Sequence, residues 1–175
     1  LAINQAKSNY NTLRNHRSTY NAQAVKLMAE YGVYCGMTLD VVDASKKKDK
    51  DLCIKVVSVS GFSLGKVDES LKNDKDVVLA SFKNHGGALS SASSALRDDK
   101  EVVLAAVKSF GGALKSASDR LKNDKDVVFA AVTKEGSSIE FASPALKNDI
   151  EIAKQAVQKA TIIEYALRHI SKDMQ

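Results

Sequence analysis

The sequence repeats itself every 25 residues through its middle. The clearest units are LKNDKDVVLASFKNHGGALSSASSA at 71–95, LRDDKEVVLAAVKSFGGALKSASDR at 96–120 and LKNDKDVVFAAVTKEGSSIEFASPA at 121–145. The first two units are identical at 15 of 25 positions, and the first and third at 13. A fixed period of this length is typical of supersecondary units that stack and contact only their neighbours. The period therefore favours an extended binding surface over the pocket of an enzyme.

Weaker copies of the unit extend the array in both directions. A glycine recurs at one place in the unit, at positions 36, 61, 86, 111 and 136, and apolar columns keep the same register. This register predicts an N-terminal capping helix at 1–20, a tail at 171–175 and six repeats, 21–45, 46–70, 71–95, 96–120, 121–145 and 146–170.

Each repeat is expected to begin with a helix of about eleven residues. In the first clear unit, Asn73 or Asp74 can cap this helix, and Asp76 follows Asn73 at the spacing of a capping box. The apolar residues that follow have a helical period, which places Val78 and Phe82 at the centre of a buried face. This helical period therefore predicts that one face of each first helix packs into the core of the stack.

A second, shorter helix is expected after the glycines. Gly86 and Gly87 end the first helix, where a residue with positive φ is favoured, and the second helix covers roughly 88–96. In the last repeat the glycine is missing, so 149–160 and 162–171 are expected to be two helices, with one continuous helix as the alternative. Helices this short are marginal alone and need stacking. The sequence thus predicts an all-α solenoid, a curved stack of about six short helical hairpins.

The charged residues are mixed along the chain. The formal net charge is +5; residues 1–70 carry ten Lys and Arg against seven Asp and Glu, and residues 71–175 carry sixteen against fourteen. This balance is typical of a solvated surface and not of a polyanion-binding stripe. No apolar run approaches the ~18 residues of a membrane span. Two cysteines do not make a disulfide framework, so we expect an intracellular, reducing compartment. The chain begins with Leu1, and we expect it to be a fragment of a longer protein.

The consensus L-K-N-D-K-[DE]-V-V-L-A-A-V-K-x-x-G-x-A-L-x-x-A-S resembles a family of short tandem helical repeats catalogued as a domain of unknown function. Its members occur in proteins of intracellular bacteria, including secreted effectors, and in protists and large amoebal viruses. The resemblance is close at 71–145, moderate at 46–70 and 146–170, and weak at 21–45. It implies an array that mediates contacts within a larger protein or with another one. It also implies the host cytosol as the location if the chain belongs to a secreted effector, and it implies no catalytic residue.

No residues stand at a spacing typical of catalysis or metal binding. His16, His85 and His169 form no ligand-spaced pair with each other or with a cysteine. Cys35 and His16 could form a thiol–imidazole pair, but neither lies in a motif. The glycine pairs lack the preceding strand and the following Lys-Ser or Lys-Thr of a phosphate loop. We therefore expect no catalytic residue, no cofactor and no metal, and we do not expect an enzyme.

The columns just before the glycine vary most between otherwise strict repeats. They line one edge of the predicted stack and include an exposed aromatic residue, Phe110, and aromatic residues are typical anchors of interfaces. We therefore predict a protein-binding strip at Asn84, His85, Ser109, Phe110, Lys134 and Glu135, with Tyr34 and Val59 in the same columns. Drift at an exposed turn would produce the same variation. A second candidate surface is the stripe of Asp76, Ala80 and Lys83, which the helical period turns toward solvent.

Nucleic acid is a less favoured partner. The variable residues before a glycine pair are similar to those in the repeats of DNA-reading effectors of plant pathogens. However, the period here is shorter than in that family, and Lys83 and Lys108 become Ser58 and Thr133 in other repeats. Phosphate binding along an array needs a basic position that recurs.

The function that the sequence favours is a non-catalytic scaffold for protein–protein interaction. An accessory domain that positions a catalytic domain outside this chain is the leading alternative, and a nucleic-acid-binding array comes third. An enzyme would need a cleft with convergent polar groups from several repeats.

Overall fold

The structure, a computed structural model, describes residue 39 and residues 44–83 and 85–159. All regular secondary structure in these residues is helical, and it recurs as a long α-helix, a 3-10 helix and a short α-helix. The all-α repeat fold is therefore confirmed. The predicted capping helix at 1–20, most of the repeat 21–45 and the second helix of the last repeat lie outside the described residues.

The three kinds of helix follow one another in strict order after η1 (Lys46–Lys48). The long helices are α4 (Lys50–Val59), α6 (Lys75–Ser81), α8 (Lys100–Ser109), α10 (Lys125–Lys134) and α12 (Ile150–Lys159). The 3-10 helices are η2 (Gly61–Lys66), η3 (Gly86–Ser91), η4 (Gly111–Ser116) and η5 (Gly136–Phe141). The short helices are α5 (Glu69–Lys72), α7 (Ser94–Arg97), α9 (Asp119–Lys122) and α11 (Pro144–Lys147).

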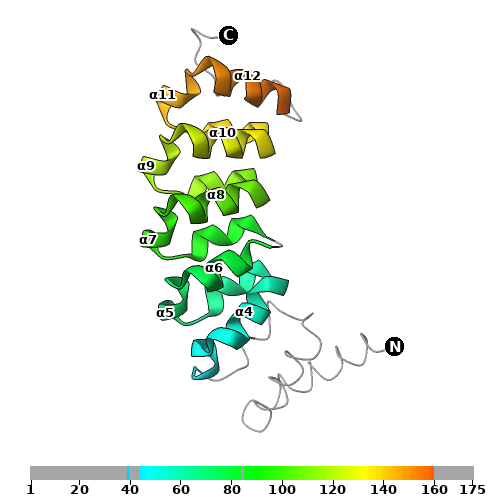
Figure 1. The fold of residues 1–175 in the computed structure, drawn as a ribbon, viewed down its shortest axis with the longest axis vertical. Helices are drawn as coiled ribbons and strands as arrows, with labels where there is room; N and C mark the ends of the chain where they lie inside the picture. Colours follow the sequence, from blue (N-terminus) through cyan, green and yellow to red (C-terminus); the bar gives the residue numbers. More distant parts are fainter. Residues whose placement is uncertain (1–38, 40–43, 84, 160–175) are drawn as a thin grey trace, which may run out of the picture.

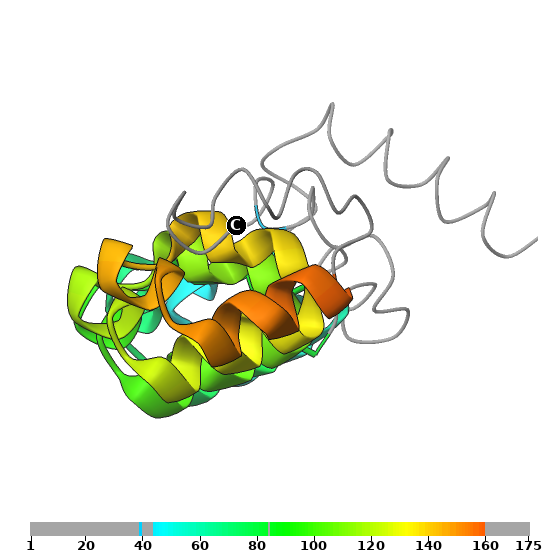
Figure 2. The same ribbon diagram turned by 90° about the horizontal axis from the view of Figure 1, so that it is seen from above.

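The repeats stack into an elongated two-layer array (Figure 1). Each long helix packs on the next, each 3-10 helix packs on the next, and the two layers pack on each other. The view along the stack shows the long helices of successive repeats running in nearly the same direction (Figure 2). The core between the layers contains fully buried residues from both, such as Val77, Val78, Leu89 and Leu114. Phe82 is also buried, as its place on the helical period predicts.

The second helix predicted at 88–96 is divided into two parts. After η3, Ala92 and Ser93 are extended, with φ of −73° and −58° and ψ of 159° and 158°. The Ser93 Oγ accepts the Leu96 N–H at 3.2 Å as the N-cap of α7, and the Ser93 N–H donates to the carbonyl of Lys72, the last residue of α5, at 2.9 Å. A continuous helix would lose both hydrogen bonds. The serine thus separates η3 from α7 and ties α7 to the preceding short helix, α5.

The capping box predicted at the start of the long helix is not formed. The N-cap of α6 is Asp74, whose Oδ1 accepts the N–H groups of Asp76 at 3.0 Å and Val77 at 3.2 Å. Asp76 therefore occupies the second position of the helix and not the third. Asn73, the C-cap of α5, is left to accept the hydroxyl of Ser93, the N-cap of α7, at 2.6 Å. The Asn-Asp pair thus serves two purposes, because its first residue links two successive short helices and its second caps the long helix.

Ion pairs link the N-terminal ends of successive long helices. Lys100 Nζ lies 2.9 Å from Asp124 Oδ2, the N-cap of the next long helix, and 2.7 Å from Asp126 Oδ2. Lys50, Lys75 and Lys125 make the same two contacts with the repeat that follows each. A lysine in the first turn opposes the helix dipole, and here two carboxylates of the neighbour compensate it. This ion-pair ladder holds the long helices parallel and in register.

Stability is expected to fall at both ends of the pH range because of the ladder. The hydrogen bond from Lys75 holds the pKa of Asp99 below its ordinary value of 3.8, so this contribution is present above that pH and is lost as the pH falls through the lowered pKa. Hydrogen bonds to two carboxylates raise the pKa of Lys50 from 10.5 to about 12, so its contribution is complete below pH 10.5 and is lost as the pH rises through about 12.

Urea unfolding at a series of pH values measures this dependence. The Lys75→Gln variant, which removes the partner of Asp99, should lose less stability than the wild type on acidification. A wild-type stability that does not change on acidification through the ordinary carboxyl range would contradict the role given to the ladder.

Candidate interaction surface

The residues of the predicted strip lie at the C-terminal ends of the long helices, on the edge opposite the short helices (Figure 1). Phe110 and Glu135 each occupy the single extended position between a long helix and the following 3-10 helix, and His85 is the extended residue directly before η3. Asn84 lies outside the described residues. The structure brings two of the predicted side chains together: the rings of His85 and Phe110 are stacked, with centroids 6.2 Å apart and an interplanar angle of 17°.

A third ring, Phe62, extends this contact and was not predicted. Its centroid lies 3.9 Å from that of His85, with an interplanar angle of 35°. We call the three side chains Phe62, His85 and Phe110 the aromatic strip. They come from three successive repeats, so the strip runs along the array and not within one unit.

Comparison of columns did not predict Phe62, because Phe62 does not stand in the column of the other two rings. It aligns with Gly87 and Gly112, two positions after His85 and Phe110. A Cβ at Gly112 would lie 2.7 Å from Phe110 Cζ, and a Cβ at Gly87 would lie 2.7 Å from His85 Nε2. Each ring therefore covers the second glycine of its own repeat. The repeat 46–70 has Ser in the ring column, and its Phe fills the place that the glycine leaves open elsewhere. The other two repeats have a ring followed two residues later by glycine, whereas this repeat has Ser60 followed by Phe62. This exchange of ring and small residue is the signal that could have located Phe62.

The strip is the main apolar surface of the described residues. Among them, four large apolar side chains are exposed, and three lie on this edge: Val59 at 42%, Phe62 at 69% and Phe110 at 43%. The fourth, Ile150, stands at the first position of α12, where the other long helices have the lysine of the ladder. Exposed aromatic side chains that cluster across repeats are the kind of anchor that interfaces use.

Two predicted strip residues bind the neighbouring repeat. The Ser109 hydroxyl donates to the Phe82 carbonyl at 2.8 Å, which is available because α6 ends three residues earlier in its repeat than α8 does. Glu135 Oε2 accepts the Gly112 N–H at 3.3 Å, and Oε1 accepts the Ser137 hydroxyl at 2.8 Å. These contacts give both residues a structural role. Lys134 is exposed.

The second candidate surface is not a continuous exposed stripe. Asp76 and Lys83 are exposed, but Ala80 is only 8% exposed and belongs to the core. The prediction was wrong for Ala80, since α6 is flanked by α4 and α8 and its methyl group is too short to reach past them. Asp76 is also engaged by Lys50 of the preceding repeat.

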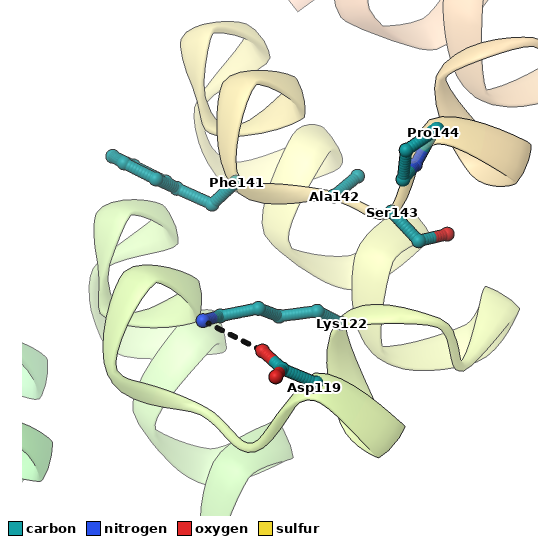
Figure 3. A pocket seen from close by; sticks show the side chains of 6 residues that line it. All are labelled: Asp119, Lys122, Phe141, Ala142, Ser143 and Pro144. Atoms are coloured by element: carbon teal, nitrogen blue, oxygen red, sulfur yellow. Dashed lines mark hydrogen bonds and ion pairs between the residues drawn. The ribbon is translucent and has the colours of Figure 1, made fainter.

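A shallow pocket of about 240 Å³ opens between α9 and the segment that joins η5 to α11 (Figure 3). Its lining consists of Asp119, Lys122, Phe141, Ala142, Ser143 and Pro144. Lys122 Nζ lies 3.4 Å from Asp119 Oδ1, so its two charged groups are paired with each other. In residues 44–83 and 85–159 no three His, Cys, Asp or Glu side chains come close enough to hold a metal ion.

The one cysteine described, Cys53, is a core residue. Burial, with a smaller effect of Asp49 and Asp68, raises the pKa of its thiol to about 11, so the reactive thiolate is disfavoured. Cys35, His16 and His169 lie outside the described residues, and the reducing compartment stays a prediction. No helix among the described residues is long and apolar enough to cross a bilayer.

Comparison with known families places the repeat. A family model described as a domain of unknown function, DUF4116, matches residues 49–97, 99–147 and 130–175. The chain belongs to this family. The first two matches begin at Asp49 and Asp99, the N-caps of α4 and α8, and each covers nearly two of the 25-residue units. Searches of curated proteins and of solved structures found no match.

Proposed function

We propose that the chain is a non-catalytic scaffold that binds another protein along the C-terminal edge of its long helices. The observation that carries this proposal is the aromatic strip, in which two exposed rings and a histidine from three repeats form one surface. A stack that only had to bury its own core would have no need to place phenylalanines here. Polar residues at these turns would satisfy the fold equally well, as Glu135 does in its own repeat.

The polar residues of the array support a structural and not a catalytic role for its charged groups. The N-cap carboxylates of the long helices accept backbone N–H groups, and those of α6, α8, α10 and α12 also bind a lysine of the preceding repeat. Asp98 is held by the Ser118 hydroxyl and by Arg120, and both lower its pKa. These carboxylates are fixed as anions by structural partners, whereas acid–base catalysis needs groups poised to exchange protons.

Replacing the exposed rings is expected to weaken partner binding without unfolding the array. A photoreactive amino acid at Phe62 should cross-link a protein in cells, whereas the same group at Ala145, an exposed position of α11, should not. The affinity of the identified partner should then fall by about tenfold or more in the Phe62→Ala, Phe110→Ala double variant, since aromatic anchors dominate interface energies.

The Ala145→Ser variant is the matched control for that measurement, and circular dichroism checks that each variant stays helical. An affinity that is unchanged in the double variant would overturn the proposed function.

A further inference from the structure

The parallel stack leaves the C-terminal ends of the long helices almost without acidic residues. At the N-terminal edge, every long helix begins with an N-cap aspartate and has a second acid two residues later. Beyond that point the balance reverses. The stretches 52–62, 77–87, 102–112, 127–137 and 152–159 contain six lysines and one acid, Glu135. At the N-terminal edge the acids stand among lysines that pair with them, whereas the C-terminal edge carries lysines almost alone, and the aromatic strip lies on this basic edge.

Three lysines flank the aromatic strip directly. Lys83 and Lys108 precede His85 and Phe110 by two residues, and Lys134 continues the row in the next repeat. All three are exposed, and none of the ion pairs formed within the described ranges includes them. The basic position therefore recurs in the same column at Lys83 and Lys108 and is shifted by one residue at Lys134. A lysine in the last turn suits the helix dipole, which explains the charge but not the exposed rings beside it.

We propose that this basic, aromatic edge binds an acidic linear peptide segment of a partner protein, with apolar side chains of the segment on the aromatic strip and its carboxylates near Lys83, Lys108 and Lys134. This inference rests on the proposed function and adds the chemistry of the partner. Complementary charge would steer the encounter, and the rings would supply the anchor. Long helices about 10 Å apart place three repeats across about 20 Å, which six or seven residues of an extended peptide span.

The same edge is less suited to a nucleic acid. Proteins that bind single strands stack bases on separate aromatic faces, whereas the three rings here contact one another, with centroids 3.9 and 6.2 Å apart. Arginine is the preferred phosphate ligand, but both arginines of the described residues, Arg97 and Arg120, belong to the short helices on the other edge. A carboxylate, Glu135, also stands in line with the strip.

Fluorescence anisotropy with defined probes tests the proposal. The probes are a labelled peptide of about 12 residues containing Asp, Glu, Phe and Ser, the same peptide with Asn and Gln in place of the acids, and an oligo-dT of similar length. The acidic peptide should bind about tenfold or more tightly than the amide peptide and the oligo-dT. Its affinity should fall as salt rises from about 50 to about 300 mM, because the charges are exposed.

Matched variants locate the binding. Lys83→Gln, Lys108→Gln and Lys134→Gln together should weaken binding of the acidic peptide about tenfold. Replacing Lys46, Lys115 and Lys147, which lie in η1, η4 and α11, by Gln changes the net charge by the same amount. This control should change the affinity for the acidic peptide less than about twofold. Phe62→Ala with Phe110→Ala should also weaken it about tenfold. Equal losses in the two lysine triples, or equal binding of the acidic and amide peptides, would overturn the proposal.

Two outcomes separate this inference from the proposed function. If the protein cross-linked at Phe62 contacts the strip through a neutral or basic segment, the scaffold role stands and the acidic-peptide inference is wrong. If the oligo-dT is the preferred probe and no protein is cross-linked, both are wrong.

Discussion

The Gly111→Ala substitution is expected to destabilise the array by about 2–3 kcal/mol, which is the cost of an overpacked contact that cannot relax. A Cβ at Gly111 would lie 2.7 Å from the Ala131 carbonyl oxygen and 2.8 Å from Glu135 Cβ, both in the next repeat. The carbonyl oxygen belongs to α10, whose backbone is held by its own hydrogen bonds and by the ladder at its other end. The added methyl group must therefore push two repeats apart.

Gly112→Ala is the matched control, because the neighbouring glycine meets a side chain and not a backbone. The nearest atoms to its Cβ would be those of the Phe110 ring, with Cζ 2.7 Å away, and this ring is exposed and can turn away. We expect a change in stability smaller than about 1 kcal/mol but weaker partner binding, since the ring leaves the strip. Urea unfolding followed by circular dichroism measures both stabilities. Equal stabilities of the two variants would show that the close approach of the repeats is not the reason why position 111 requires glycine.

This pair also shows where the sequence misleads. The recurrent glycine predicts a helix end with positive φ, and none of the glycines at 61, 86 and 111 has one. The long helices α4, α8 and α10 already end at the extended residue before the glycine. The glycine is needed because the next repeat comes too close for a side chain. A glycine column alone cannot distinguish these two causes, because the second depends on the neighbouring unit.

The period itself predicts the architecture well. It gives the repeated helices, the buried faces that contain Val78 and Phe82, and the edge at which His85 and Phe110 meet. These features depend on positions within a unit, so comparison of columns reveals them. The second part of the repeat, predicted as one helix at 88–96, was less predictable. The run of serines and alanines looks like one helix, and only the hydrogen bonds from Ser93 to Lys72 and Asn73, at the end of the preceding short helix, show why it breaks.

The candidate surface also depends on contacts between repeats, which the sequence of a single repeat does not show. Counting charges along the chain gives an even mixture, because each repeat carries its acids and its lysines within a few residues of each other. The basic edge arises because the long helices are parallel and in register, so that the lysines near their C-terminal ends lie side by side. This arrangement is seen only in contacts between units, such as Lys100 with Asp124 and Asp126, which no single repeat contains. Phe62 was missed for a related reason, since its ring joins the strip from a different column.

The Leu114→Ala substitution is expected to lower the free energy of unfolding by about 3 kcal/mol, within the range of about 2–5 kcal/mol for a large-to-small change in a core. Leu114 is fully buried, and η4, which carries it, packs on η3, on η5 and on two long helices. In a stacked array each unit is stabilised mainly by its neighbours, so a cavity in a central unit weakens two interfaces at once.

The Leu104→Ala variant is the matched control, because Leu104 lies in the same repeat but is only half-buried. It should cost about 1 kcal/mol, in proportion to the smaller area removed from water. Hydrogen exchange resolves where the loss occurs: in Leu114→Ala, protection should fall in η3, η4 and η5 together and remain higher in η2, which does not pack on η4. A uniform loss of protection from η2 to α12 would show instead that the described repeats unfold as one cooperative unit, so that the nearest-neighbour account of their stability is wrong.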